Sequence, residues 1–211
     1  MIKIENFYKQ FGEKRLFNDF SLEVKKGEFI ALMGPSGSGK TTLLNAIGLI
    51  EPIERGNYEI LSKQAPKINT NSAMKMIREN ISYLFQNFAL VDYLTVEENL
   101  MMALKYTKLS KIQKREKIEN ALHSVGLPGH EKIKVFELSG GEQQRIAIAR
   151  VIIKPGDIIL ADEPTGALDA KNRDEILSIL LKLNQKGKTI IIVTHDLVVA
   201  KHCHRIIELA N

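Results

Sequence analysis

A glycine-rich stretch constrains this chain more than any other part of its sequence. Residues Gly34-Pro35-Ser36-Gly37-Ser38-Gly39-Lys40-Thr41 fit the phosphate-binding pattern GxxxxGK[ST] in full. An apolar run from Phe29 to Met33 precedes the stretch, and a helical pattern follows it. A buried strand, a tight loop and a helix in this order predict a cradle for the phosphates of a nucleotide.

The residue types in this loop suit that task. Glycines let the backbone fold tightly enough for its amides to face phosphate oxygens. We expect Lys40 to hold the β- and γ-phosphates, the Thr41 hydroxyl to ligate Mg²⁺, and Thr42 to donate to the α-phosphate. The rest of the predicted nucleotide-binding loop consists of Gly34, Pro35, Ser36, Gly37, Ser38 and Gly39. The alternative, a chance glycine-rich turn, is disfavoured by the Lys-Thr pair and the flanking elements.

Two acids end a second apolar run. Ile158 to Ala161 predict a buried strand, and Asp162 and Glu163 stand at its tip. We expect Asp162 to hold the Mg²⁺ shell and Glu163 to polarise the attacking water, as general base or as its orienting partner. Taken alone, such a run is as consistent with a strand that simply enters a loop. The phosphate-binding loop upstream favours the chemical interpretation.

Short apolar strands alternate with helical stretches, which is typical of an α/β fold with a largely parallel sheet. Phe29 to Met33, Ile158 to Ala161 and Thr189 to Thr194 are continuous apolar runs, as expected of central parallel strands covered on both faces. Ile2 to Phe7 and Ser21 to Lys25 alternate instead and predict half-buried strands.

Between about residues 74 and 153 the pattern becomes helical. Thr95-Val-Glu-Glu98 and Ser110-Lys-Ile-Gln113 match the capping box, in which side chains satisfy the first free amides of a helix. Gly126 and then Pro128 predict the end of the second helix. A helical insertion therefore interrupts the α/β core.

Composition and charge narrow the class of protein. The chain has 211 residues and a net charge of +5, with one cysteine, Cys203, which excludes an internal disulfide and fits a reducing compartment. We find no signal-peptide pattern and no apolar run long enough for a membrane helix, and we expect a cytoplasmic location. Much of the positive charge lies in Lys105, Lys108, Lys111, Lys114, Arg115 and Lys117.

That basic cluster has helical spacing and indicates a solvated face, with attraction to anionic lipid as the alternative. No aromatic residues are interleaved to stack bases, so we expect no nucleic-acid partner. The run His202-Cys203-His204 suggests a metal site or, more simply, a frayed helix end. Three adjacent ligands do not converge easily on one ion, which favours the helix end.

A second glycine-rich segment indicates the class of nucleotide-binding protein. Leu138-Ser139-Gly140-Gly141-Glu142-Gln143-Gln144-Arg145 forms another anion cradle, with Ser139 and Glu142 spaced as a capping box. The segment resembles the LSGGQ signature of the ABC ATPase family, and the resemblance covers essentially the whole chain. It implies a head-to-tail dimer, a homodimer or a pair with a related cassette. The signature of each subunit closes over the γ-phosphate held by the other.

The same resemblance assigns the remaining site residues. Gln86 matches the glutamine that touches Mg²⁺, so the implied metal set is Thr41, Gln86 and Asp162. His195 matches the switch histidine that contacts the γ-phosphate, and Phe11 matches the aromatic that stacks on adenine, with Tyr8 as the fallback. The segment that crosses the dimer interface corresponds to Ala167, Leu168 and Asp169. The implied cofactors are ATP and Mg²⁺.

The resemblance also implies the architecture. We expect a P-loop NTPase core, a mostly parallel sheet flanked by helices, with an antiparallel β subdomain and an inserted α-helical subdomain. One ABC ATPase domain would span residues 1–211. Residues 1–73 and 154–211 would form the core and the β subdomain, and residues 74–153 the helical insertion with the signature.

Two classes of ABC protein remain to be compared. Soluble ABC ATPases carry two cassettes or long coiled coils, whereas this chain has one cassette and no sustained heptads. The resemblance therefore implies the ATPase subunit of a transporter, bound to a separate membrane permease at the inner face of the cell membrane. The loop and signature resemble the macrolide-exporter and lipoprotein-releasing group. Tyr83 to Leu90 and Leu168 to Glu175 look most like ATPases of lactococcin-type bacteriocin export, so peptide, drug or lipoprotein cargo is expected.

Overall fold

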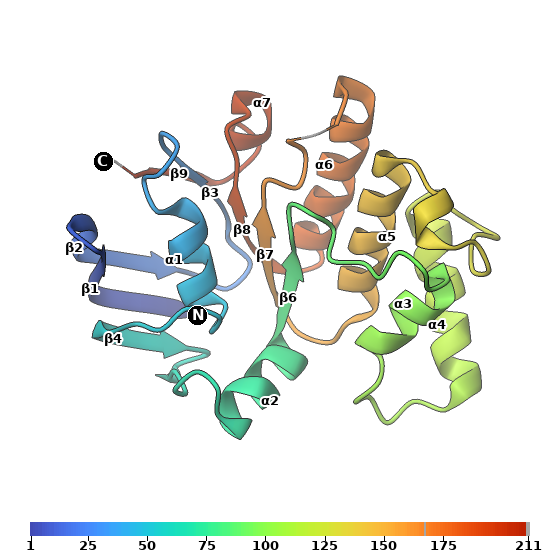
Figure 1. Cartoon of the computed structure of the whole chain (residues 1–211), viewed down its shortest axis with the longest axis horizontal. Coiled ribbons are helices and arrows are strands. Elements are labelled where there is room, and N and C mark those ends of the chain that lie inside the picture. Colours follow the sequence, from blue (N-terminus) through green and yellow to red (C-terminus); the bar gives the residue numbers. More distant parts are fainter. Residues whose placement is uncertain (167, 210–211) are drawn as a thin grey trace.

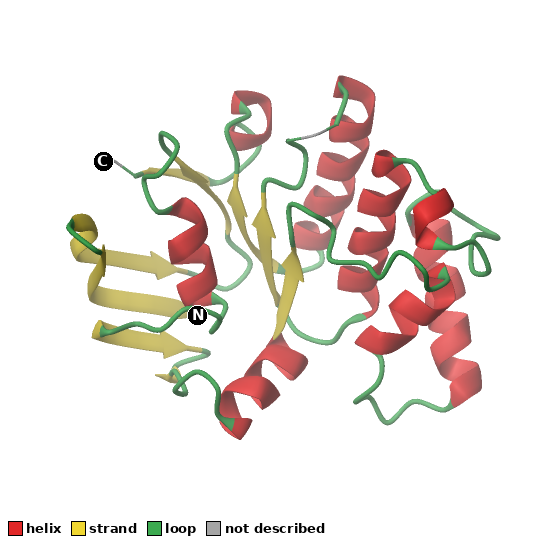
Figure 2. Cartoon of the chain, viewed as in Figure 1, coloured by secondary structure: helices red, strands yellow, loops and turns green. Residues whose placement is uncertain are grey.

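Two sheets and a set of helices make up this computed structural model, which describes residues 1–166 and 168–209, without the side chains of Phe11 and Lys14 (Figures 1 and 2). The strands are β1 (Ile2–Phe11), β2 (Lys14–Val24), β3 (Phe29–Met33), β4 (Arg55–Ile60), β5 (Lys63–Gln64), β6 (Ile81–Leu84), β7 (Ile158–Asp162), β8 (Thr189–Val193) and β9 (Arg205–Glu208). The helices are α1 (Lys40–Ile47), α2 (Asn71–Asn80), α3 (Val96–Ala103), α4 (Lys111–Ser124), the short 3₁₀ helix η1 (Val135–Glu137), α5 (Gly140–Ile153), α6 (Ala170–Gln185) and α7 (Leu197–Ala200).

The central sheet is parallel, with strand order β6-β7-β8-β3-β9. Every residue of β7 and β8 is buried, because helices cover both faces. Ala31 and Ile192 belong to the core formed with α3 to α6, whereas their neighbours Ile30 and Ile191 belong to the core formed with α1 and the other sheet. The prediction of continuous apolar strands in a parallel sheet is confirmed, since each face needs its own apolar residues.

The second sheet is antiparallel, with strand order β2-β1-β4-β5. Ile2, Ile4, Leu22 and Val24 are buried in the core behind α1, whereas Lys3 and Glu23, which alternate with them, are exposed. This alternation confirms the half-buried strands expected near the N-terminus and the antiparallel β subdomain. The strands β4, β5 and β9 were not predicted, because they are short and most of their residues are exposed or only partly buried.

Capping decides where the inserted helices begin and end. Thr95 and Ser110 each accept a hydrogen bond from the third amide of α3 and α4, and both capping boxes are complete. Gly126 follows α4 with φ of 74°, and Leu127 N donates to Leu122 O at 2.9 Å. The two predicted helix starts and the predicted stop are therefore confirmed.

The expected start of the helical insertion at about residue 74 needs correction. That position lies inside α2, and the next element, β6, pairs with β7 as part of the parallel sheet. The continuous helical block runs from α3 to α5, and it lies on the side of the sheet opposite to α1 (Figure 1). We keep the division into a core and one inserted helical unit as a proposal, with the insertion starting after β6.

The parallel arrangement brings the predicted site residues to one edge of the sheet. The phosphate-binding loop follows β3, Asp162 and Glu163 end β7, and His195 follows β8. These strands are neighbours and run in the same direction, so their carboxyl ends meet at that edge.

Candidate nucleotide-binding site

A cavity of about 630 Å³ opens at the carboxyl edge of the parallel sheet. It brings together residues that are far apart in the sequence but were predicted for one site. Its walls consist of Leu16, Ser36, Gly37, Gly39, Lys40, Thr41, Thr42, Gln86, Asp162, Glu163, Gly166, Val193 and His195. Leu16, Gly166 and Val193 were not predicted, and they lie next to predicted elements in space or in sequence.

The glycine loop before α1 is shaped as a cradle. Lys40 Nζ donates hydrogen bonds to Gly34 O at 2.9 Å and Pro35 O at 2.8 Å, so the lysine lies across the loop. A Cβ at Gly34 would come within 2.3 Å of Leu209 O, and one at Gly39 within 2.7 Å of the Phe17 ring. Both glycines have positive φ, 146° and 92°, so glycine is required there for shape as well as for space.

The cradle fits an oxyanion. Ser38 Oγ is buried and has no hydrogen-bond partner within the described part of the chain, although a hydroxyl normally finds one when buried. The free amides at the start of α1 and the Lys40 ammonium supply further donors and positive charge at the same place. A phosphate chain satisfies these groups, and the residues of the loop therefore fit the nucleotide that the sequence predicts.

The expected Mg²⁺ ligands are also adjacent. Thr41 Oγ1 donates a hydrogen bond to Asp162 Oδ1 at 3.2 Å. Burial raises the pKa of Asp162, while the hydrogen bond from Thr41 and the charge of Lys40 act in the opposite direction. A hydroxyl and a carboxylate are oxygen ligands of the kind that Mg²⁺ prefers, so the donor set fits the ion.

Glu163 occupies an unusual backbone position at the end of β7. Its φ is 46°, and its amide donates to Val193 O at 3.0 Å, which fixes the turn against β8. Glu163 Oε1 lies 3.2 Å from His195 Nε2, within ion-pair distance, and it has no hydrogen-bond partner within the described part of the chain. Burial raises the pKa of the Glu163 carboxyl, and the charge of His195 lowers it.

Gln86 lies just beyond β6, exposed at the rim of the same cavity. A second hollow of about 510 Å³ beside it is lined by Thr41, Asn87 and Asp162 among others. Tyr83, which sequence reasoning did not assign, donates to Asn45 Oδ1 at 2.5 Å and stacks on Phe85. Burial, with a smaller contribution from the charge of Asp162, raises the Tyr83 pKa.

The predicted signature, Leu138 to Gln143, forms the start of α5. Ser139 caps the helix, its amide donates to Glu142 Oε2 at 2.8 Å, and hydrogen bonds from Ser139 lower the pKa of Glu142. A Cβ on Gly140 would meet no atom within 4 Å, so this helix start is open to solvent. None of the signature residues Leu138, Ser139, Gly140, Gly141, Glu142 and Gln143, all of which the structure describes, lines the cavity.

Two further predictions, the aromatic that stacks on adenine and the segment at the dimer interface, concern the edges of the site. The Phe11 side chain and Ala167 lie outside the part of the protein that the structure describes. The fallback, Tyr8, has its ring 5.3 Å from the Arg55 guanidinium and 5.9 Å from that of Arg15, and it does not line the cavity. Asp169 caps α6, and Leu168 N donates to Thr165 O at 3.1 Å.

The side chains of residues 202–204 do not converge. His204 Nδ1 accepts from Phe29 N at 3.0 Å, and Cys203 Sγ donates to Val199 O at 3.7 Å. Burial raises the Cys203 pKa to about 12. Within the described residues, no group of three or more His, Cys, Asp and Glu side chains could hold a metal ion.

Comparison with known proteins gives the family. A profile described as "ABC transporter" matches residues 17–166, from the second strand to the turn after Glu163. The chain belongs to the ABC transporter family. As the ATP-binding cassette of that family it is an ATPase that uses ATP with Mg²⁺, as expected from the two glycine-rich segments and the paired acids. The predicted P-loop NTPase fold is confirmed with it.

Curated relatives and solved structures agree with this assignment. The chain is 40% identical over its full length to the macrolide export ATP-binding/permease protein MacB of Campylobacter jejuni and 38% identical to MacB of Escherichia coli. It spans about a third of the length of these relatives, 33% in both cases. The dimeric bacterial ABC transporter cassette MJ0796 superposes with a TM-score of 0.91 at 39% identity, covering 100% of this chain and 94% of that one.

A second MJ0796 structure, a dimeric post-hydrolysis state bound to ADP and Pi, superposes with a TM-score of 0.90 at 38% identity, covering 99% of this chain and 94% of that one. The cassette cbiO1 from Clostridium perfringens, described as part of the ABC transporter complex cbiONQ, has a TM-score of 0.87 at 27% identity over 99% of this chain and 84% of that one. Within the described residues, no helix is long and apolar enough to cross a membrane.

Proposed function

We propose that two of these cassettes bind ATP between them, head to tail, and that hydrolysis drives a separate membrane permease. One observation carries the proposal: the signature at the start of α5 lies outside the cavity that holds the phosphate-binding loop, on a helix that covers the opposite face of the sheet. An anion cradle that its own nucleotide does not reach needs a nucleotide from another subunit. A two-fold dimer gives each site one loop and one signature.

The roles within one site follow from the contacts. Lys40 exchanges the carbonyls of Gly34 and Pro35 for the β- and γ-phosphates, and Thr41 and Asp162 hold Mg²⁺, with Gln86 at the rim. When bound, Mg²⁺ neutralises charge on the phosphate oxygens. Glu163 accepts the proton of the attacking water or orients it, and burial keeps this carboxylate basic.

His195 completes the set. Its ring lies beside Glu163 and is more than half exposed, so it can turn toward a γ-phosphate that closes the cavity. In the proposed dimer, Ser139 and the amides of Gly140 and Gly141 from the partner face the same phosphate, and Leu168 and Asp169 lie at the interface. Dimeric structures of the similar cassette MJ0796, one of them with ADP and Pi, support this pairing.

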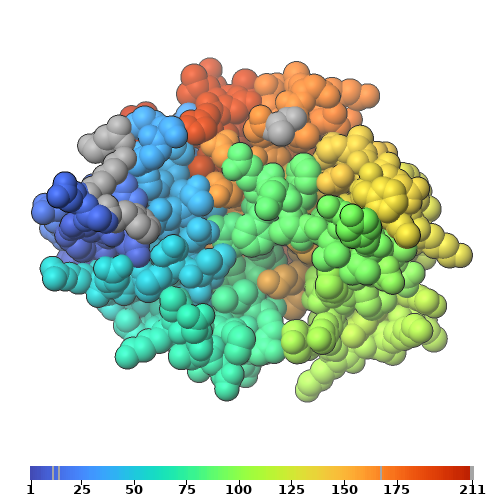
Figure 3. Space-filling view, in the orientation of Figure 1, coloured from blue at the N-terminus to red at the C-terminus, as the bar shows by residue number. Residues whose placement is uncertain are grey.

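A groove supports the permease as partner. A cavity of about 610 Å³ lies between α2, the segment after α3 and the end of α5, on the face seen in Figure 3. Ile50, Met102 and Tyr106 line it and are between 46% and 67% exposed, so three large apolar side chains gather at one groove. We propose that a cytoplasmic segment of the permease binds here and holds the cassette at the inner face of the membrane.

The cargo is inferred only from relatives. The similar MacB proteins are named macrolide export ATP-binding/permease proteins, which supports an exporter of drug, peptide or lipoprotein-type cargo. Within that range we propose peptide or bacteriocin export, from the resemblance of the sequence. The alternative is an ABC ATPase not linked to transport. Copurification with a permease and cargo uptake into inverted vesicles would decide between them.

The dimer is tested by a pair of variants. Glu163→Gln with ATP and Mg²⁺ is expected to run as a dimer in size-exclusion chromatography, because binding persists while turnover stops. Ser139→Arg added to it is expected to restore the monomer with ATP affinity retained, since the signature acts only across the interface. A Glu163→Gln protein that binds ATP yet stays monomeric would contradict the proposal.

A further inference from the structure

The chain turns sharply at Gln86, immediately after β6. Phe88 N donates to Phe85 O at 3.1 Å and closes a turn in which Gln86 and Asn87 are the central residues. Phe88 and Ala89 then both have positive φ, 62° and 49°, although neither is glycine. Two successive left-handed residues of this kind cost free energy, so other contacts must hold the loop in this shape.

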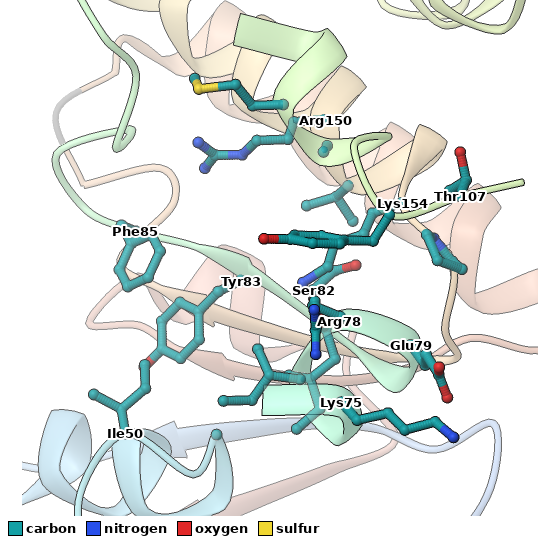
Figure 4. Close-up of a pocket in the computed structure, with 18 of the residues that line it drawn as sticks. Ile50, Lys75, Arg78, Glu79, Ser82, Tyr83, Phe85, Thr107, Arg150 and Lys154 are labelled. Carbon is teal, nitrogen blue, oxygen red and sulfur yellow. Dashed lines mark hydrogen bonds between the residues drawn. The ribbon is translucent and has the colours of Figure 1, made fainter. Parts of the chain in front are cut away.

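Arg150 supplies those contacts. It lies in the last turn of α5, and its guanidinium donates to Phe88 O at 2.8 Å from Nη2 and to Ala89 O from Nη1. Figure 4 shows Arg150 pointing from its helix toward the loop that continues from Phe85. One rigid, planar group thus binds the carbonyls of the two strained residues that follow the Gln86 turn.

Arg150 differs in its partners from two other arginines of the helical region. Arg115 and Arg145 pair with carboxylates, Glu97 and Glu175, but no carboxylate within the described residues pairs with Arg150. Burial disfavours its charged form. A partly buried cation that gives its donors to carbonyls is costly to keep for packing alone, since a neutral side chain would fill the same space.

A second polar anchor fixes the outer part of the loop. Asn99 is buried, accepts from Val91 N at 2.8 Å and donates to Val91 O at 3.1 Å. Asn99 thus holds the outer part of the loop, and within the described residues Arg150 is the side chain that hydrogen-bonds the backbone directly after the Gln86 turn. The helix that carries Arg150 near its end carries the signature at its start.

We propose that Arg150 is a positioning residue for catalysis: it fixes the backbone after Gln86, so that the Gln86 side chain faces the Mg²⁺ and γ-phosphate side of the cavity. Because Ser139 caps the start of the same helix, a shift of the signature helix is passed to Gln86 through the guanidinium. This inference rests on the proposed function, in which Gln86 contacts Mg²⁺ and the signature binds the partner's nucleotide.

A double-mutant cycle on ATP hydrolysis by the full chain tests the role. The variants are Arg150→Met, Gln86→Ala and their combination, with Arg115→Met as the matched control at an exposed ion pair. Steady-state kcat and the Kd for ATP are measured for each. We expect Arg150→Met to lower kcat on the order of 10- to 100-fold, because a displaced group loses most of its effect. The Kd should stay within about twofold, and Arg150→Met should add nothing once Gln86 is alanine.

The kcat of Arg150→Lys is expected to fall between those of the wild type and Arg150→Met, since an ammonium reaches one carbonyl but not both. Additive losses of kcat in the cycle, or a loss confined to ATP affinity, would overturn the role of Arg150. If circular dichroism shows that Arg150→Met is unfolded, the cycle is repeated with Arg150→Lys in its place. Additive losses of kcat in that cycle would again overturn the role of Arg150. A wild-type chain that does not hydrolyse ATP overturns the proposed function itself, which separates the two failures.

Discussion

Thr41 Oγ1 and Asp162 Oδ1, 121 positions apart in the sequence, are joined by a hydrogen bond of 3.2 Å. This contact ties the first turn of α1 to the end of β7, so the residues expected to hold Mg²⁺ are already adjacent. Thr41 and Asp162 would hold Mg²⁺ through oxygen atoms, and because they are already adjacent the site would need little rearrangement to accept the ion.

Asp162→Asn should therefore impair metal use more than nucleotide binding. The amide keeps the shape and can still pair with Thr41, but it lacks the charge that attracts Mg²⁺. We expect the Mg²⁺ concentration for half-maximal ATPase activity to rise on the order of 10- to 100-fold. Titration of the rate with Mg²⁺ at saturating ATP measures this. An unchanged titration would remove Asp162 from the metal site.

Lys40→Ala should weaken nucleotide binding strongly, because it deletes the cation that faces the β- and γ-phosphates. A hydrogen bond to a charged group contributes about 1.5–3 kcal/mol, so ATP affinity should fall by roughly 10- to 100-fold or more. Calorimetric titration with ATP measures the loss. Lys40→Ala also frees the Gly34 and Pro35 carbonyls, so circular dichroism must confirm the fold. ATP affinity equal to that of the wild type would refute the loop assignment.

The acid limb of the pH–rate profile should report Glu163. Its pKa is raised by burial, so the rate should fall on acidification at a higher pH than an ordinary glutamate would give. His195→Ala removes the charge that lowers this pKa, and the acid limb should then move to still higher pH. The measurement is kcat of the wild type and of His195→Ala between weakly acid and neutral pH, which locates the acid limb in each. A limb that shifts downward in His195→Ala contradicts the assignment.

The same pKa has a consequence for stability. A carboxyl with a raised folded-state pKa stabilises the fold most when it is protonated, and this contribution is lost as pH rises through the folded-state pKa. Glu163→Gln removes that loss. At neutral pH we expect Glu163→Gln to have a higher Tm than the wild type, with the difference shrinking as the pH is lowered. A Tm difference that grows on acidification would have the wrong sign.

Two neighbouring glycines of the signature provide a matched pair. A Cβ at Gly141 would lie 2.9 Å from Asn172 Oδ1, whereas one at Gly140 would meet nothing within 4 Å. Asn172 also accepts from Arg145 Nη1 and donates to Asp169, so displacing it disturbs the link between α5 and α6. Gly141→Ala should therefore be less stable than Gly140→Ala by about 1 kcal/mol in urea unfolding. Equal stability would mean that Asn172 moves aside freely.

Several features could be predicted from the sequence because they depend on neighbours along the chain. The glycine spacing before Lys40 and the capping boxes at Thr95, Ser110 and Ser139 are local, since the groups involved lie within a few residues. The continuous apolar runs of β3, β7 and β8 likewise predicted buried parallel strands. Burial of a whole strand requires apolar residues on both faces, whatever the partner.

Other features depend on contacts between distant segments. Nothing near Arg150 in the sequence indicates that its guanidinium binds the backbone after Gln86. The strand β9 is short and mostly exposed, and it joins the sheet by pairing with β3. The start of the helical insertion depends on such a contact too, because the sequence does not show that β6 pairs with β7 in the parallel sheet.

By itself, the sequence determined the kind of chemistry, since two anion cradles and a pair of acids require specific residues at fixed local spacing. Only the tertiary structure decided that the first cradle and the acids share one cavity, while the second cradle starts a helix on the other side of the sheet. The order in which the strands pair, and the face of the sheet that each helix covers, keep the two cradles apart. Both are properties of the assembled sheet rather than of any one segment.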